Sequence, residues 1–314
     1  MPSYLEDLTL RLAMGANLLP EDVRARHAGF LRRAQNADGG FSGREGGSDL
    51  YYSGFAVRGL ALLGELDGEP AERAAEFLRG RLGGQAPVVD FFSLLYAAAL
   101  LETSAGIDVF AAAAAGWRGA VDAALERFRR PDGGYAKTEE GQSSSTYYTF
   151  LVALSREIIG IPPGDTAQLV DFVLSRRRDD GGFVEMGPMK RSGTNPTAAA
   201  IGTLKVAGAL SPEVREATLD FLCEMQSDEG GLTANTRIPI ADVLSTFTGT
   251  LTWLDLGGAA FADALDLSHA RRYVESMQLA DGGFRGGEWD LGTDVEYTFY
   301  GLAGLALLYG AAEN

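Results

Sequence analysis

Aromatic residues recur at one kind of place in this chain, the start of apolar segments that carry little charge. The large side chains at these places are Tyr51, Tyr52, Phe91, Phe92, Tyr147, Tyr148, Leu244, Phe247, Tyr297 and Tyr300. Aromatic rings offer a large apolar contact area, and their faces attract cations. Small residues such as Ala98, Ala199 and Gly304 follow deeper in the same segments. We predict that all of the large residues except Phe91 line a hydrophobic substrate pocket; the alternative is that they fill a solid core.

Basic residues recur in the polar loops that precede the apolar segments. Five of the six loops carry at least one, and these residues are Arg44, Lys137, Lys190, Arg191, Arg237 and Arg285. Helix N-termini favour anions, so loops that lead into helices form a favourable rim for a negative group. This rim is a candidate site for the diphosphate head of a ligand. The alternative is that these basic residues are ordinary solvent-exposed charges that bind nothing.

Charge and composition exclude several classes of protein. The 43 acidic and 27 basic residues give a formal charge of −16, which argues against a nucleic-acid partner. The apolar stretches 91–101 and 110–117 are shorter than the ~20 residues of a membrane span. Residues 1–10 lack a secretion-signal pattern, and the single cysteine, Cys223, excludes an intramolecular disulfide. We expect a cytoplasmic protein.

A Gly-Gly pair recurs six times along the chain. The pairs begin at Gly39, Gly83, Gly133, Gly181, Gly230 and Gly282, 44 to 52 residues apart. Four follow an aspartate and precede an aromatic residue, the pair at 230 is a close variant, and only the pair at 83 is degenerate. Glycine takes the positive φ of a tight reversal, and aspartate bonds nearby amides. The pattern predicts six copies of a helix–turn–helix unit.

The two helices of each unit differ in character. The first carries charge on one face, as in residues 21–33, and the second is nearly uncharged and often ends at a glycine such as Gly64. Each second helix is predicted to begin at a preferred N-cap residue: Asp49, Asp90, Ser145, Asn195, Asp242 or Asp294. Charged helices outside and apolar helices inside bury all their apolar faces if the hairpins close into a ring. We predict an all-α fold, one (α/α)6 toroid domain of six hairpins over residues 1–314 with a central apolar cavity.

The Gln-Asn-Ala-Asp-Gly-Gly-Phe stretch at 35–41 and its copies resemble the repeat of protein prenyltransferase β subunits and of squalene-hopene and other class II terpene cyclases. The resemblance covers essentially the whole chain, and residues 241–243 and 297–305 look most like Rab geranylgeranyltransferase β subunits. It implies a central funnel that binds an isoprenoid diphosphate, and a helical α subunit as partner. It also implies that Arg237, and Lys190 with Arg191, lie at or beside diphosphate-binding positions.

The same resemblance implies a zinc ion held by an aspartate, a cysteine and a histidine. These positions fall on Asp242, Leu244 and Tyr297, so two of the three ligands are missing. Asp242 is explained as a helix N-cap. Cys223, His27 and His269 fall on outer helices and cannot replace the missing ligands. We expect no zinc and no other cofactor.

Three functional classes remain open. The first is a prenyltransferase β-like protein that binds an isoprenoid or another small apolar ligand, with or without transferring it. The second is a class II terpene cyclase, although its Asp-x-Asp-Asp acid motif is absent. The third is a non-catalytic scaffold that forms a homodimer or pairs with a helical subunit. Sugar-processing toroids use pairs of carboxylates for catalysis. Asp90 and Glu296 could form such a pair, but nothing in their spacing in the sequence selects them.

Overall fold

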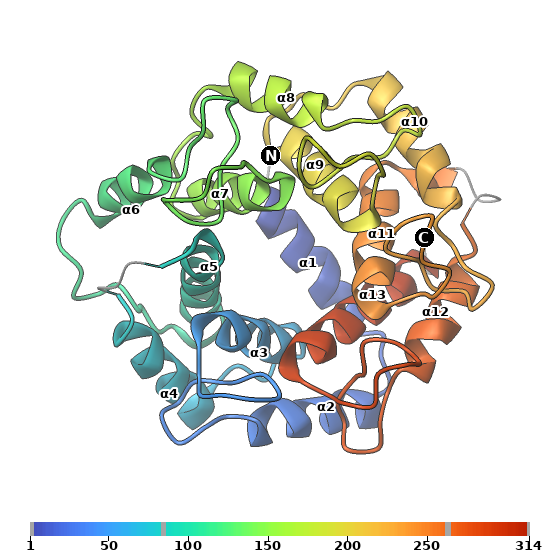
Figure 1. The fold of residues 1–314 in the computed structure, drawn as a ribbon. Helices are drawn as coiled ribbons and strands as arrows, with labels where there is room; N and C mark the ends of the chain where they lie inside the picture. The colour runs from blue at the N-terminus through green and yellow to red at the C-terminus, as the bar shows by residue number, and fades with distance from the viewer. Residues whose placement is uncertain (1–2, 83–85, 261–264, 313–314) are drawn as a thin grey trace.

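The computed structural model describes residues 3–82, 86–260 and 265–312. Within these ranges the chain forms thirteen α-helices, one short 3-10 helix at 258–260 and no strand. Six helices form an outer ring: α2 (Glu21–Arg33), α4 (Gly68–Arg79), α6 (Trp117–Glu126), α8 (Thr166–Ser175), α10 (Pro212–Cys223) and α12 (Leu267–Ser276). Six form an inner ring: α3 (Leu50–Leu62), α5 (Val88–Ala105), α7 (Thr146–Ile158), α9 (Thr194–Val206), α11 (Val243–Asp255) and α13 (Val295–Ala312). Figure 1 shows the two rings end-on, and they confirm the predicted toroid.

Each described Gly-Gly turn follows the outer helix of its own hairpin and packs against the next hairpin. In the five turns that the structure describes, the first glycine has a φ between 85° and 95°. A β-carbon on Gly39 would lie 2.2 Å from the carbonyl oxygen of Arg73 in α4, so each turn packs directly on the following outer helix. The aspartate of the motif acts as predicted, because Asp38 accepts a hydrogen bond from the Gly40 amide at 3.1 Å. The pair at Gly83 lies outside the described residues.

The last turn closes the ring by the same contact. A β-carbon on Gly282 would lie 2.5 Å from the carbonyl oxygen of Arg26 in α2, the first outer helix. His27 of α2 is fully buried, and its Nδ1 bonds the Gly282 carbonyl. Because the sixth turn docks on the first hairpin as the other described turns dock on their neighbours, the described repeats form a closed ring.

Four of the six predicted N-caps are confirmed. Asp49, Ser145, Asp242 and Asp294 each accept a hydrogen bond from an amide three residues later. The other two predictions are wrong. Helix α5 is capped at Pro87 and α9 at Gly193, so Asp90 and Asn195 lie inside the first turn.

Helix α1 (Tyr4–Ala16) has no counterpart in the repeat, and the sequence pattern does not predict it. It lies across one end of the ring (Figure 1), near the C-terminal ends of the inner helices. The Glu157 carboxylate near the end of α7 accepts hydrogen bonds from the amides of Tyr4 and Leu5, at 2.8 and 3.0 Å. At the other end, Gly15 touches the backbone of Ala306 in α13. The helix therefore closes this end of the central space.

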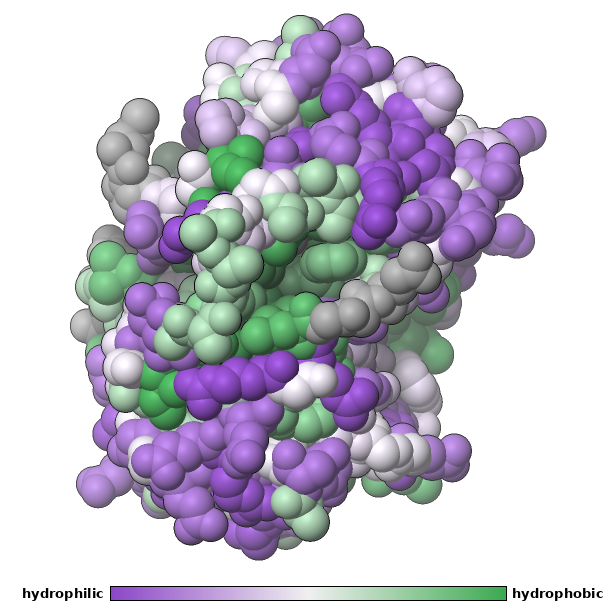
Figure 2. Space-filling view, turned by 90° about the vertical axis from the view of Figure 1, so that its left-hand side faces the viewer, coloured by the Kyte–Doolittle hydropathy of each residue, from purple (hydrophilic) through white to green (hydrophobic). Residues whose placement is uncertain are grey.

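Among the described helices, only α5 has the length and apolar composition of a membrane span, and half of its residues are buried inside the fold. It packs between α3 and α7 as one helix of the inner ring. Figure 2 views the ring from the side of α5 and α6. Hydrophobic residues gather there in a hollow, between hydrophilic upper and lower parts of the face.

Candidate functional site: a cavity inside the inner ring

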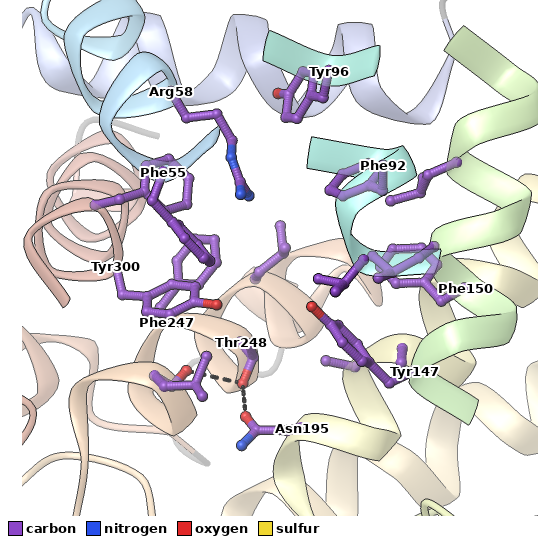
Figure 3. A pocket seen from close by; sticks show the side chains of 18 of the residues that line it. Phe55, Arg58, Phe92, Tyr96, Tyr147, Phe150, Asn195, Phe247, Thr248 and Tyr300 are labelled. Atoms are coloured by element: carbon purple, nitrogen blue, oxygen red, sulfur yellow. Dashed lines mark hydrogen bonds between the residues drawn. The ribbon is translucent and has the colours of Figure 1, made fainter. Parts of the chain in front are cut away.

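A cavity of about 360 Å³ lies inside the inner ring (Figure 3). All six inner helices contribute to its wall, and α1 contributes Tyr4, Leu5, Leu8 and Leu12. The volume falls in the range of small-molecule sites, roughly 300 to 1,000 Å³. Most of the lining is apolar or aromatic, so the cavity suits a hydrophobic ligand.

The structure divides the predicted pocket residues into two groups. Six of them line the cavity: Tyr51, Phe92, Tyr147, Leu244, Phe247 and Tyr300. Tyr52, Tyr148 and Tyr297 are not part of its wall. The ring of Tyr52 packs beside Gly43, and that of Tyr297 beside Gly286, both in loops that precede inner helices. Successive residues of a helix point about 100° apart, and here Tyr51 and Tyr147 face the cavity whereas the next residues, Tyr52 and Tyr148, do not.

Several lining residues were missed, and helical spacing contains the signal for most of them. Phe55 and Tyr96 follow predicted lining residues by four positions, and Phe150 follows Tyr147 by three. Such residues share a helix face. Arg58 lies one further turn along α3, where it is the only charged residue of that helix. The four residues from α1 had no such signal, because α1 is not part of the repeat.

Edge-on and tilted aromatic contacts hold one side of the wall. The rings of Phe55 and Tyr300 have centroids 5.0 Å apart, and those of Phe247 and Tyr300 are 5.7 Å apart. Phe55 also contacts Tyr51, at 4.9 Å. These contacts join α3, α11 and α13 across the junction between the last and first repeats, and they fix the shape of this wall.

Two carboxyl groups, those of Glu185 and Glu296, line the mostly apolar cavity. The Tyr51 hydroxyl donates a hydrogen bond to Glu296 Oε1 at 2.6 Å, and the Ser145 hydroxyl donates one to Glu185. Burial raises the pKa of both glutamates above the ordinary value, and these hydrogen bonds oppose the shift. Burial also raises the pKa of the tyrosines that line the cavity, including Tyr147 and Tyr300. The cavity wall therefore favours the neutral, protonated forms of these glutamates and tyrosines.

The predicted diphosphate-binding residues lie outside the cavity. Lys190, Arg191 and Arg237 are exposed on the loops before α9 and α11, and none of them lines the cavity. Among the described residues, none of their side chains forms an ion pair or a hydrogen bond. Arg44 lies on a similar loop but pairs with Asp290 and Asp294. The cavity wall itself carries one cationic side chain in the described structure, Arg58.

The donor atoms at the implied zinc positions do not fit zinc. Both carboxylate oxygens of Asp242 bond Ser245, one to its amide at 2.6 Å and one to its hydroxyl at 2.8 Å. Leu244 offers no ligand atom, and Tyr297 packs beside Gly286. Zinc prefers sulfur and nitrogen ligands. No cluster of three or more His, Cys, Asp or Glu side chains with metal-binding geometry occurs in the described parts of the chain.

Sequence and structure comparisons connect this fold to known proteins. The family model of the prenyltransferase alpha-alpha toroid domain matches residues 13–312. The beta subunit of geranylgeranyl transferase type-2 from Saccharomyces cerevisiae is 30% identical over 186 residues, which are 56% of this chain and 54% of that protein. The match thus spans about half the length of this curated relative.

Solved structures share the architecture at low sequence identity. Candida albicans protein geranylgeranyltransferase-I, complexed with GGPP, is 18% identical, with a TM-score of 0.72 over 90% of both chains. A variant of the type II terpene cyclase MstE from Scytonema, in complex with geranylgeranyl dihydroxybenzoate, is 16% identical, with a TM-score of 0.66 over 95% of this chain and 99% of that one. A glycosidase is 14% identical, with a TM-score of 0.60 over 94% and 99%. These likenesses show the fold alone, and the match of the domain family to nearly the whole sequence shows that this chain belongs to the prenyltransferase alpha-alpha toroid family.

Proposed function

We propose that this chain is a prenyltransferase β-like protein that binds an isoprenoid in its central cavity. The observation that carries the proposal is the cavity itself, which is lined by aromatic and aliphatic side chains from every inner helix and closed at one end by α1. A long apolar ligand gains free energy from burial in such a site, about 25 cal/mol for each Å² of apolar surface. GGPP and a geranylgeranyl compound in the two solved relatives support this ligand class.

The proposal does not include zinc-dependent transfer to a protein thiol. Zinc makes a substrate cysteine a thiolate at neutral pH, whereas a free thiol, with a pKa near 8.5, is mostly protonated there. Leu244 and Tyr297 leave two of the three implied ligand positions without a suitable donor. We expect no prenyl transfer from geranylgeranyl diphosphate to a cysteine peptide, whether or not zinc is added. If the chain does have catalytic activity, transfer of an isoprenoid group by another route is the reaction that its family favours.

Adjacent tyrosines provide a matched test of isoprenoid binding. Tyr147→Ala removes a ring from the cavity wall, and Tyr148→Ala removes the same ring from the next position, which does not line the cavity. Loss of one buried aromatic contact is worth on the order of 2 kcal/mol, so we expect Tyr147→Ala to weaken binding of geranylgeranyl diphosphate tenfold or more. Tyr148→Ala should stay within threefold of wild type in isothermal titration calorimetry. Equal effects of the two changes, or no binding by wild type, would contradict the proposal.

Glu296 favours a second candidate, a class II terpene cyclase. Its carboxyl group faces an apolar, aromatic cavity, and burial raises its pKa, which are the properties of an acid that can protonate an alkene. Aromatic faces stabilise the carbocation that follows. Product analysis after incubation with linear isoprenoids tests this candidate: cyclic products that disappear in Glu296→Gln would support it, and unchanged substrate would reject it.

The assembly and the location of the protein stay predictions from the sequence. A homodimer or a complex with a helical partner is expected from the resemblance, and a cytoplasmic location stays an expectation. Light scattering after gel filtration measures the first of these directly.

A further inference from the structure

Arg58 lies in the cavity wall with its guanidinium surrounded by aromatic rings. Its Cζ lies 4.0 Å from the ring centroid of Phe55, 5.0 Å from that of Phe299, and 5.7 Å from those of Phe92 and Tyr96. These rings belong to α3, α5 and α13. Figure 3 shows the side chain leaving α3 and pointing into the open space between the rings.

The guanidinium has no anionic partner in the described structure. Its Nε donates a hydrogen bond to the Gly54 carbonyl one turn earlier, at 2.9 Å, and its two Nη atoms have no hydrogen-bond partner there. Glu296 also lines the cavity, but its carboxylate accepts a hydrogen bond from Tyr51 and forms no ion pair with Arg58. An unpaired charge in apolar surroundings costs free energy, which cation–π contacts offset only in part. A bound anion would remove that cost.

Two further hydrogen-bond donors face the same space. In Figure 3 the hydroxyl groups of Tyr147 and Tyr300 point into the cavity from α7 and α13. Neither hydroxyl has a hydrogen-bond partner among the described residues. Burial raises the pKa of both tyrosines, and the charge of Arg58 opposes this shift, which places the three groups in one electrostatic environment. The Nη atoms of Arg58 and the hydroxyl groups of Tyr147 and Tyr300, from three helices, thus face one cavity without a hydrogen-bond partner among the described residues.

We propose that Arg58, assisted by the hydroxyl groups of Tyr147 and Tyr300, binds the anionic head of the ligand inside the cavity. The head is a carboxylate or a phosphate, because the planar fork of a guanidinium pairs with either group through two hydrogen bonds. The cations of the rim loops, Lys190, Arg191 and Arg237, lie outside the cavity and do not hold it. This inference rests on the proposed function, because it assumes that the apolar part of the ligand occupies the same cavity.

Three probes with one farnesyl-type chain test the proposal. Farnesol is neutral, farnesoic acid carries a carboxylate, and farnesyl monophosphate carries a phosphate. Calorimetry in one detergent-containing buffer measures their affinities for wild type, for Arg58→Gln and for the rim control Arg237→Gln. We expect wild type to bind at least one anionic probe tenfold or more tightly than farnesol, and the tighter anionic probe identifies the head group. Arg58→Gln should bind farnesol within threefold of wild type and lose the preference for the anion, whereas Arg237→Gln should keep it.

The outcomes separate the two proposals. If wild type binds none of the probes, the proposed function fails. If it binds farnesol as tightly as both anions, or if Arg237→Gln rather than Arg58→Gln removes the preference, only the present inference fails. If Arg58→Gln does not fold, the double variant Tyr147→Phe, Tyr300→Phe removes just the two hydroxyl groups; the preference should then fall at least threefold, and an unchanged preference would overturn the assignment.

Discussion

At the residue scale, burial controls the charge of the cavity. Glu296 is enclosed by the first and last inner helices, and burial raises its pKa above the ordinary value of 4.5. The unfolded chain therefore releases this proton at a lower pH than the folded chain does. Between the two pKa values the folded state binds more protons, so the free energy of unfolding falls as the pH rises through this window.

We predict that Glu296→Gln removes this fall. Gln stays neutral at every pH, so the stability of the variant relative to wild type should rise as the pH increases from about 4.5 to 8. Urea unfolding at several pH values measures the difference. Glu140→Gln removes a negative charge from an exposed loop and controls for the change in net charge. A relative stability of Glu296→Gln that falls with rising pH would show that the folded protein favours the ionised carboxylate.

At the scale of elements, α1 decides that the central space is a cavity with a closed end. The inner helices leave an opening where their C-terminal ends meet, and α1 lies across it. Three of its leucines, Leu5, Leu8 and Leu12, line the cavity. Its first amides bond Glu157, and its Thr9 hydroxyl bonds that of Tyr96 at 2.8 Å. Close packing against α13 depends on Gly15, because any β-carbon there would lie 1.9 Å from the Ala306 carbonyl oxygen.

We predict that Gly15→Ala displaces α1 and destabilises the protein by about 1 to 3 kcal/mol, the usual cost of overpacking. The matched control is Gly119→Ala on α6, where a β-carbon meets nothing within 4 Å. This second change should keep or raise stability, because alanine favours the helix over glycine. Chemical unfolding measures both variants, and hydrogen exchange of the α1 amides should speed up in Gly15→Ala alone. Equal stability of the two variants would show that α1 does not need this close contact.

At the scale of the whole molecule, ion pairs strengthen the junction between the first and last repeats. Arg44, on the loop before α3, contacts Asp290 at 2.6 Å and Asp294 at 2.9 Å, on the loop before α13. Its guanidinium lowers the pKa of Asp290 from 3.8 to about 2. A lowered pKa means that the stabilisation is complete above pH 3.8 and is lost as the pH falls towards 2.

We predict that Arg44→Gln lowers the free energy of unfolding by about 1 to 2 kcal/mol at pH 7, a range that allows for the partial exposure of Arg44. The difference from wild type should shrink as the pH is lowered from 3.8 towards 2. Arg177→Gln breaks an ion pair with the exposed Glu213 between α8 and α10, and it should cost roughly 0.5 kcal/mol or less. A difference for Arg44→Gln that does not change with pH would argue against the role of Asp290.

The sequence alone determined the architecture, because most of the repeats carry the same local signals. A glycine that must take a positive φ, an aspartate that bonds the turn and an uncharged second helix recur together, and neighbouring copies must dock alike. The sequence contains one more signal of the repeat. The aromatic residue after the turn donates its amide hydrogen to a hydroxyl group 14 residues later, as Tyr135 does to Thr149 at 2.9 Å. The lining rings were predictable in part, because the start of each inner helix was placed within a few residues, although which tyrosine of an adjacent pair faces inward depends on the exact register.

The tertiary structure alone decided what closes the cavity and where its charges lie. Helix α1 belongs to no repeat, and its place follows from contacts with residues about 150 to 300 positions away, such as Glu157 and Ala306. Glu185 lines the cavity although it lies on a loop of the fourth repeat, because that loop bonds the start of α7 in the third. The guanidinium of Arg58 lies among aromatic rings from three helices, and the sequence alone does not bring these rings together. Contacts of this kind join distant segments, and only the closed ring brings those segments together.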